Sequence, residues 1–515
     1  MSITKVTYSM ISGASINVLD YGADPTGVSN STAAITAAIT AAPNNGQIIF
    51  PAGTYLVVPA TDVVYNDLSS VTRKTAFEIS NKNNLSFTSE GHVNIVVGGT
   101  APERVAFYFN NCDNITFQNI GFNLANTQIS EPGTTYLTTE DFIPIAMSGC
   151  DGVTIQGCKF VACRTAVFAD DFNGSGNANI QVINSTFREV CNYSLITRKA
   201  NSVLFSNNFC FATGRSWNTD NEDCAFSNLT AQAQAIGNQF ISPIGTVSRI
   251  TAAKNTGPTI VSNNIKNGKG IFFEAYEASN GVVSNNTSVN FVDTAEHFLF
   301  TADSNTGGEN WVISSNYFRG GGFCISDYFS GTHVKNGLTV TGNSFINCYG
   351  PVASAPRSSV VVTGNHFQLN NSGQLIYFSG DGTIFSNNKV QNGYLKIYSD
   401  NTSNGWSITG NRFDGNSTPI PYVFDISGTV NHFIENNSLS GGYSAWFNTS
   451  PALRFGFKYT DVGFSTSPET AGSTYLTTSV GDKAINISPV SGGYIGWVCT
   501  TAGIPGTWKT YGLIS

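Results

Sequence analysis

The chain has 515 residues, of which 41% are hydrophobic and only 11% are charged, and its formal net charge at pH 7 is −8. An acidic chain without a basic run is poorly suited to nucleic acid, because that binding depends on neutralising phosphates. It has no stretch of about 18 apolar residues and no apolar signal sequence, so insertion into a membrane is not expected. The ten cysteines form no CxxC pairs. We therefore expect buried free thiols in a protein made in a reducing cytoplasm, with no metal and no other cofactor.

The N-terminal part contains the one convincing helix of the chain. The segment TAAITAAITAA is rich in helix formers, and Pro43 closes it. Ser29, Asn30 or Ser31 is expected to be the N-cap. A short helix here would cover the strand edges that an open stack of strands exposes. We predict a connector at 1–14 and a capping segment with this helix at 15–60.

A short phrase then recurs along the chain: alternating apolar residues, a small residue, Asn, any residue, and an apolar or aromatic one. Copies include TIQGCKF at 154–160, VINSTF at 182–187, LTVTGNSF at 338–345 and WSITGNRF at 406–413. Most successive copies lie about 22 to 31 residues apart, a period too short for propeller blades and without the leucine pattern of leucine-rich repeats. Two or three short strands in each such period predict a parallel β-helix.

The recurrent Asn has a physical explanation in that fold. Stacked Asn side chains can bond along the stack, and Asn tolerates the left-handed backbone of a tight corner. The Phe or Ile two residues further on is expected to stack inside. We assign 61–450 to a parallel β-helix of about 12–13 coils that carries the substrate groove. The Asn phrase is lost from about residue 451, so we assign 451–515 to a small β domain for trimerisation or capping.

Both ends of the chain resemble a known family. The segments YSMISGASINVLDYGADPTGVSNSTAAITAAI and IIFPAGTYLV look like the opening of bacteriophage tailspikes of the pectate-lyase-like superfamily. The ending YIGWVCTTAGIPGTWKTYG is similar to a closing segment of many phage tail proteins. The resemblance implies a right-handed β-helix, a parallel homotrimer, and binding and usually cleavage of O-antigen or capsular polysaccharide. It leaves the chemistry open, because hydrolases, lyases and deacetylases share this scaffold.

The resemblance also implies a place in the virion. Such a protein is made in the host cytoplasm, joins the phage tail and acts at the outer surface of the bacterium. No large head-binding domain precedes residue 15. We therefore expect either that such a domain has been trimmed from this chain, or that the protein attaches to the tail or an adaptor protein through the short segment before Gly13.

The coil spacing turns an alignment of strands into distances, because neighbouring coils lie about 4.8 Å apart. Aligning the strand that precedes each Asn phrase gives one outward column: Asp170, Arg198, Asn228, Ala252, Glu274, Thr301 and Asp327. Asp303 lies two residues past Thr301, on the same face. Glycoside hydrolysis needs two carboxyl groups, about 5–5.5 Å apart for retention or about 6.5–9.5 Å for inversion. Glu274, Asp303 and Asp327 are therefore the predicted acid and base, or otherwise a solvated acidic face.

An insertion beside this column supplies a second set of candidates. The loop GRSWNTDNEDC at 214–224 carries Trp217, a natural platform for a sugar ring. The same loop carries Glu222 and Asp223, either of which is an alternative catalytic group. The predicted substrate-binding residues are Trp217, Arg198, Arg215, Asp223, Tyr276, Glu277, Lys254 and Tyr328. His297 is expected to be structural.

The predicted function is that of a tailspike endoglycosidase for O-antigen or capsule. A polysaccharide lyase is the first alternative, because Arg198, Arg249, Lys254 and Arg319 could neutralise a uronic acid. A non-catalytic adhesin is the second. A site formed between subunits is also open.

Overall fold

The structure is a computed structural model, in which the chain falls into two compact units, Met1–Thr301 and Ala302–Ser515. It describes residues 15–64, 72–99, 103–124, 141–170, 176–213, 223–242, 248–268, 270–290, 297–302, 307–329, 335–353, 357–370, 374–378, 382–398, 405–415, 420, 423–427, 433–441, 462–463, 480–481, 483–486, 489–503 and 507–515. Within these ranges, no helix is long and apolar enough to cross a membrane.

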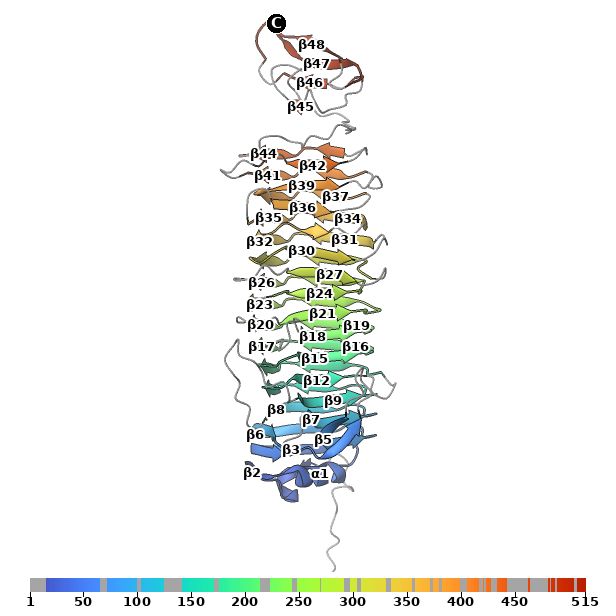
Figure 1. Cartoon of the computed structure of the whole chain (residues 1–515), viewed down its shortest axis with the longest axis vertical. Helices are drawn as coiled ribbons and strands as arrows, with labels where there is room; N and C mark the ends of the chain where they lie inside the picture. Colours follow the sequence, from blue (N-terminus) through green and yellow to red (C-terminus); the bar gives the residue numbers. More distant parts are fainter. Residues whose placement is uncertain are drawn as a thin grey trace, which may run out of the picture. The chain divides into compact units, whose positions relative to one another are not determined.

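A regular coil contains three short strands. One coil consists of β13 (Ile180–Ile183), β14 (Thr186–Arg188) and β15 (Tyr193–Arg198). Each strand pairs in parallel with its counterpart in the next coil, so that Ile180 lies opposite Val203 and Leu195 opposite Ala225. We call the three resulting strand stacks the first, second and third walls. Within each unit, the strands of a wall lie as successive rungs (Figure 1). The predicted parallel β-helix is confirmed.

The first unit begins with β1 (Ser15–Asn17), β2 (Thr26–Asn30), β3 (Gln47–Val57), β4 (Thr61–Val64), β5 (Thr72–Ser80), β6 (Ser86–Val97), β7 (Glu103–Asn110), β8 (Thr116–Leu124) and β9 (Asp141–Ser148). Its first wall continues with β10 (Thr154–Gln156), β13, β16 (Ser202–Ser206), β19 (Gln232–Ile236), β22 (Thr259–Ser262) and β25 (Gly281–Ser284). Its second wall has β11 (Lys159–Val161), β14, β17 (Phe209–Phe211), β20 (Gln239–Ser242), β23 (Ile265–Gly268) and β26 (Thr287–Val289). Its third wall runs from β5, β7 and β9 to β12 (Thr165–Ala169), β15, β18 (Asp223–Asn228), β21 (Arg249–Ala253), β24 (Phe273–Tyr276) and β27 (Phe298–Ala302).

The second unit repeats the plan. Its first wall has β28 (Trp311–Ser314), β31 (Lys335–Thr341), β34 (Arg357–Thr363), β37 (Ile384–Ser386), β40 (Ser407–Thr409) and β43 (Phe433–Glu435). Its second wall has β29 (Tyr317–Arg319), β32 (Ser344–Cys348), β35 (His366–Leu369), β38 (Lys389–Gln391), β41 (Arg412–Asp414) and β44 (Ser438–Ser440). Its third wall has β30 (Ile325–Phe329), β33 (Val352–Ala353), β36 (Gln374–Phe378), β39 (Gly393–Tyr398) and β42 (Phe424–Ser427). A separate sheet contains β45 (Val462–Gly463), β46 (Lys483–Ile485), β47 (Tyr494–Thr501) and β48 (Thr507–Leu513).

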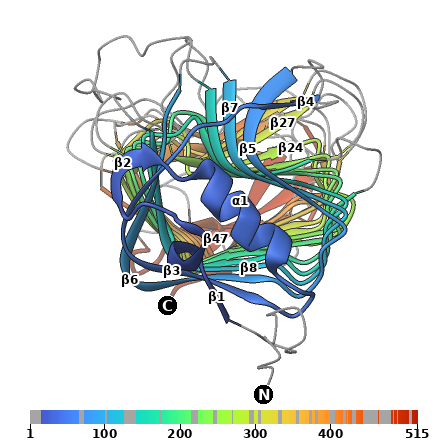
Figure 2. The same cartoon turned by 90° about the horizontal axis from the view of Figure 1, so that it is seen from below.

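The predicted helix is present as α1 (Thr32–Ala41), preceded by a short 3-10 helix, η2 (Val18–Tyr21). The helix lies across the end of the first unit, with Ile35 and Ile39 buried (Figure 2). Ser31 is the N-cap residue, but its hydroxyl accepts the Asp24 N–H instead of capping the helix. The Thr32 N–H donates to the Asn30 side chain at 3.0 Å. Of the candidate caps, Asn30 therefore caps the helix, and Ser31 stabilises the preceding loop.

Each corner between the first and second walls has two specialised positions. The first position has a left-handed backbone, with φ of 54° at Asn207, 71° at Gly237 and 57° at Asn263. From Asn208 onward the second position is an Asn that bonds to the same position in neighbouring coils, whereas two earlier corners have Cys158 and Ser185 there. In the first unit these are Asn208, Asn238, Asn264 and Asn286, with Nδ2–Oδ1 distances of 3.1, 2.9 and 3.0 Å. In the second unit they are Asn316, Asn343, Asn365, Asn388, Asn411 and Asn437, at 2.9, 2.9, 3.0, 3.0 and 2.9 Å.

The asparagine ladder is thus confirmed. The left-handed turn and the bonding along the stack, which were predicted for one Asn, belong to two consecutive residues. The ladder also reveals a copy of the phrase that the sequence reading missed, VVSNNTSV at 282–289, which contains Asn286.

An aromatic stack fills the lumen behind the corners. The rings of Phe160 and Phe187 are parallel within 7°, with centroids 5.0 Å apart. In the first unit this column continues through Cys210, Phe240, Lys266 and Ser288. The prediction that Phe209 and Ile265 fill the column is wrong, since they are 38% and 50% exposed. The second Asn of each SNN phrase is the ladder residue, so the inward position falls one residue later.

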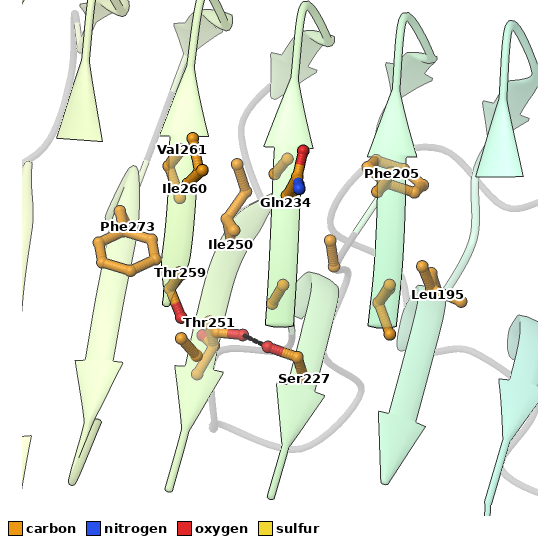
Figure 3. Close-up of a pocket in the computed structure, with 15 residues that line it drawn as sticks. Leu195, Phe205, Ser227, Gln234, Ile250, Thr251, Thr259, Ile260, Val261 and Phe273 are labelled. Atoms are coloured by element: carbon orange, nitrogen blue, oxygen red, sulfur yellow. Dashed lines mark hydrogen bonds between the residues drawn. The ribbon is translucent and has the colours of Figure 1, made fainter. Parts of the chain in front are cut away.

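A small cavity of about 30 Å³ lies in the lumen of the first unit, lined mostly by apolar side chains from β15 to β24 (Figure 3). Ala225, Ala233, Ala235 and Ala252 lie in its wall, where larger side chains would fill the space. At its edge the Ser227 hydroxyl donates to the Thr251 carbonyl at 3.4 Å (Figure 3). The cavity is therefore a packing defect of the core.

Candidate functional site

The observed register of the third wall changes the predicted column. Arg198 pairs with Asn228, and Asn228 pairs with Ala253, which pairs with Tyr276. Glu274 pairs instead with Thr251. The alignment was therefore correct at Arg198 and Asn228 but wrong at Ala252 and Glu274. The shift builds up in two steps, because Asn228 pairs with Ala253 one residue later than assumed, and Ala253 pairs with Tyr276 one residue later again.

The error at Glu274 amounts to two residues, which moves it along the strand without changing its face. Two residues correspond to a shift of about 6.6 Å, and side chains at i and i+2 point the same way. Glu274 therefore shares the outer face of the third wall with Tyr276. The row expected for Glu274 is occupied by Tyr276, whose main chain pairs with Thr301.

A cleft opens on this face of the first unit, with about 500 Å³ of space. Its lining residues are Asn228, Leu229, Arg249, Thr251, Ala253, Lys254, Glu274 and Tyr276. A volume of this size falls in the range of small-ligand sites. The lining combines one carboxylate, two cations, an amide and an aromatic ring, which are the groups that hold a polar sugar.

Glu274 is bound to Arg249 at the base of the cleft. Arg249 Nη1 lies 2.7 Å from Glu274 Oε2, and the two side chains are 14% and 11% exposed. The short distance makes this a charge-assisted contact between two largely buried side chains. From the sequence, Arg249 was expected only as a possible partner of a uronic acid, because the predicted register did not place it beside Glu274.

Lys254, Tyr276 and Glu277 form a second group at the cleft. The Lys254 ammonium lies 5.7 Å from the centre of the Tyr276 ring and 3.2 Å from Glu277 Oε2. The Lys254 side chain is 48% exposed and that of Glu277 only 6%. Lys254 and Tyr276 therefore face the cleft, whereas the buried Glu277 holds the lysine in place through their ion pair.

Arg198 lies on the predicted face but outside the cleft lining. It forms an ion pair with Asp170 at 2.8 Å and stacks over the Phe168 ring at 5.7 Å. Three rungs separate its row position from Tyr276, which corresponds to roughly 14 Å. The structure therefore brings together Glu274, Tyr276, Lys254 and Glu277 but not Arg198.

Several predicted residues cannot be placed. Asp303, Trp217 and Arg215 lie outside the described residues, and so does the alternative Glu222. Asp223 and Tyr328 lie in β18 and β30, but their side chains are outside the described part. The roles predicted for these residues stay predictions.

The predicted outward position of Asp327 is wrong. In the second unit its side chain is completely buried against Arg357, with an Nη2–Oδ2 distance of 3.0 Å. Arg357 also donates to the Gly308 carbonyl at 2.8 Å. Burial raises the pKa of Asp327 to about 6, against the opposing effect of Arg357 and Lys335. The predicted catalytic role of Asp327 stays a prediction.

His297 is fully buried, with Nδ1 3.1 Å from the Ser288 hydroxyl, in keeping with the structural role expected of it. Among the described residues, no group of three or more His, Cys, Asp or Glu side chains could hold a metal ion.

Comparison with solved structures identifies the architecture. The tailspike protein of E. coli bacteriophage HK620, as a double mutant in complex with a pentasaccharide, has a TM-score of 0.55 at 12% identity, covering 97% of this chain and 91% of that one. Another double mutant of the same tailspike gives 0.54 at 13% identity, with the same coverage. The fold of this chain is therefore similar to that of this tailspike protein. The predicted right-handed β-helix and the resemblance to tailspikes are thus confirmed at the level of the fold.

The other comparisons are narrower. Residues 15–66 match the family model for rhamnogalacturonase A/epimerase, pectate lyase-like. An exopolygalacturonase from Thermotoga maritima covers 83% of the chain and 92% of its own length at 12% identity, with a TM-score of 0.33. No curated protein matches the sequence.

Proposed function

We propose that this chain is a phage tailspike that binds a bacterial surface polysaccharide, O-antigen or capsule, and cleaves it as an endoglycosidase. The observation that carries the proposal is the ion-paired Glu274 at the base of a polar cleft on the outer face of the first unit. The tailspike fold supports the phage setting, and the chemistry rests on the cleft alone.

The cleft offers recognised sugar-binding groups. The Tyr276 ring can pack against the apolar C–H face of a sugar, and Lys254 and Asn228 can bond to its hydroxyl or acidic groups. A rigid third wall holds these groups at fixed spacing, because each strand is paired on both sides. Trp217, Arg215 and Tyr328 remain proposed contacts from the sequence.

The ion pair with Arg249 assigns a chemical role to Glu274. An ionised carboxylate accepts a proton or attacks the anomeric carbon, so Glu274 is proposed as the base or nucleophile and not as the acid. The acid must be a second carboxyl group. Asp303 is the proposed donor from the sequence, and the carboxyl separation that would distinguish retention from inversion is left to experiment.

A polysaccharide lyase is the second candidate, and one observation favours it. Arg249 and Lys254 lie in the same cleft, where they could neutralise the carboxylate of a uronic acid. Both cations are already paired with carboxylates, which makes the hydrolase the better-supported reading.

The proposal is tested by incubating candidate O-antigens and capsules with the wild-type protein and the Glu274→Gln variant. Wild type should release fragments with new reducing ends, detected by mass spectrometry, and Glu274→Gln should lower the rate by about 100-fold or more. Glu90→Gln, an exposed substitution in β6, is the matched control. Products that absorb in the near ultraviolet would show a lyase, binding without new ends an adhesin, and normal cleavage by Glu274→Gln would overturn the site.

The assembly is part of the same proposal. We infer a homotrimer in the virion tail, joined to the tail or an adaptor protein through the N-terminal segment and acting at the bacterial outer surface. Sedimentation of the purified chain would measure the trimer directly, and a monomer at working concentration would contradict it.

A further inference from the structure

Most of the described cysteines lie beside another cysteine. The neighbouring pairs are Cys112 with Cys150, Cys163 with Cys191, Cys210 with Cys224, and Cys324 with Cys348. All of these thiols are free, as the sequence predicted. Pairing at so many places gives the stack sites where two thiols can react with each other.

The pair Cys112 and Cys150 has the geometry of neighbouring rungs. Asn110 pairs with Ser148 and Asp113 pairs with Asp151, so the two cysteines occupy equivalent positions in successive coils. Rungs lie about 4.8 Å apart, within the Cα separation of about 4.4–6.8 Å that a disulfide spans. Both side chains are fully buried.

The two thiols also differ in reactivity. A side-chain hydrogen bond with the neighbouring Cys150 thiol lowers the pKa of Cys112 to about 7. The same contact and burial raise the pKa of Cys150. A thiolate at neutral pH beside a protonated thiol is the arrangement in which one sulfur attacks an oxidant and the other resolves the product.

We propose that Cys112 and Cys150 are an oxidation site, at which a peroxide converts the two buried thiols into a disulfide joining successive coils. The Cys112 thiol first gives up its proton. The thiolate then attacks one peroxide oxygen, the O–O bond breaks, and the leaving hydroxide takes up that proton to become water. Cys112 is then a sulfenic acid. The Cys150 sulfur attacks it, the S–S bond forms, and the hydroxyl leaves with the Cys150 proton as water. Two thiols lose two electrons, and the peroxide becomes two water molecules.

The sequence makes this bond easy to detect. No Lys or Arg lies between Arg104 and Lys159, so trypsin leaves both cysteines in one peptide. Cleavage after Glu140 separates them. The folded protein is treated with hydrogen peroxide, denatured, alkylated and cut with a glutamate-specific protease. A linked pair of peptides is expected, about 2 Da lighter than the two free peptides together and separated again by a reductant.

Two variants test where the disulfide forms, and the wild-type experiment can be interpreted without them. Fragmentation of the linked peptides should place it at Cys112 and Cys150. Cys150→Ser should abolish the link, and Cys158→Ser, which removes a buried thiol with no cysteine neighbour, should keep it. Free alkylated thiols at both positions after peroxide treatment would overturn the proposal. So would Cys112 oxidised to a sulfinic acid without a linked peptide, or a link to another cysteine.

Discussion

Replacing one ladder asparagine should loosen its coil by a predictable amount. Asn365 Oδ1 accepts the Asn343 main-chain N–H at 2.9 Å and the Asn343 amide at 2.9 Å. Its own amide donates to the Val340 carbonyl at 2.8 Å and to Asn388 at 3.0 Å. Asn365→Ala removes these bonds and leaves the Asn343 N–H buried without its acceptor. A buried N–H without an acceptor costs about 1–3 kcal/mol of stability. With the other lost hydrogen bonds, we expect the free energy for opening this corner to fall by about 3 kcal/mol.

Hydrogen exchange at the main-chain N–H of Asn343 measures the lost stability at the corner where it occurs. Stacked repeats open locally, so a single unfolding midpoint would average over the whole chain. A loss of about 3 kcal/mol should accelerate exchange of this amide by about 100-fold. The control is Asn370→Ala, five residues away, where the side chain is exposed and the exchange rate should not change. If Asn343 stays as protected in Asn365→Ala as in wild type, the ladder does not stabilise the corner as we argue.

Other predictions concern the core, pH and the cleft. Ala235→Val should partly fill the lumen cavity and raise stability by up to about 1 kcal/mol in thermal unfolding, whereas a lowered midpoint would mean that the site is already full. The pKa of Asp327 is raised to about 6 in the folded state. Its favourable contribution to the free energy of unfolding is therefore complete below pH 3.8, the usual pKa of an Asp side chain, and is lost as the pH rises through 6. Asp327→Asn should flatten this part of the pH–stability curve, and an unchanged slope would contradict the assignment. Hydrogen bonds from Thr26 and Ser29 lower the pKa of Asp24 to about 2. Its contribution to the free energy of unfolding is therefore present above pH 3.8 and is lost as the pH falls through 2. Tyr276→Ala should weaken polysaccharide binding by about 10-fold in calorimetry, with no change in melting temperature.

The repeating part of the fold was readable from the sequence because each corner repeats a local requirement. A left-handed residue followed by an Asn recurs in most coils, and this pattern marks the rungs without any knowledge of distant contacts. The same logic failed where one coil departs from the others. Lys266 occupies a lumen position that the pattern assigned to Ile265, and its ammonium is satisfied by the Gly270 and Ile271 carbonyls at 2.9 and 2.6 Å.

The candidate site was only partly predictable, because side-chain partners depend on turn lengths that the sequence does not display. The face of Glu274 was correct, but its row was wrong, so its bond to Arg249 was not foreseen. Asp327 followed the acidic pattern of a surface column, yet the Arg357 side chain, from a later coil, encloses it. A charged residue on a strand can be assigned to a wall from periodicity, whereas its exposure requires the structure.

The asparagine ladder has a consequence for how such a chain can change over generations. Each corner is satisfied by the corners directly before and after it, so a longer or shorter connection elsewhere in a coil leaves the ladder intact. A chain built in this way can therefore change the segments between walls while keeping a few corner residues in each coil.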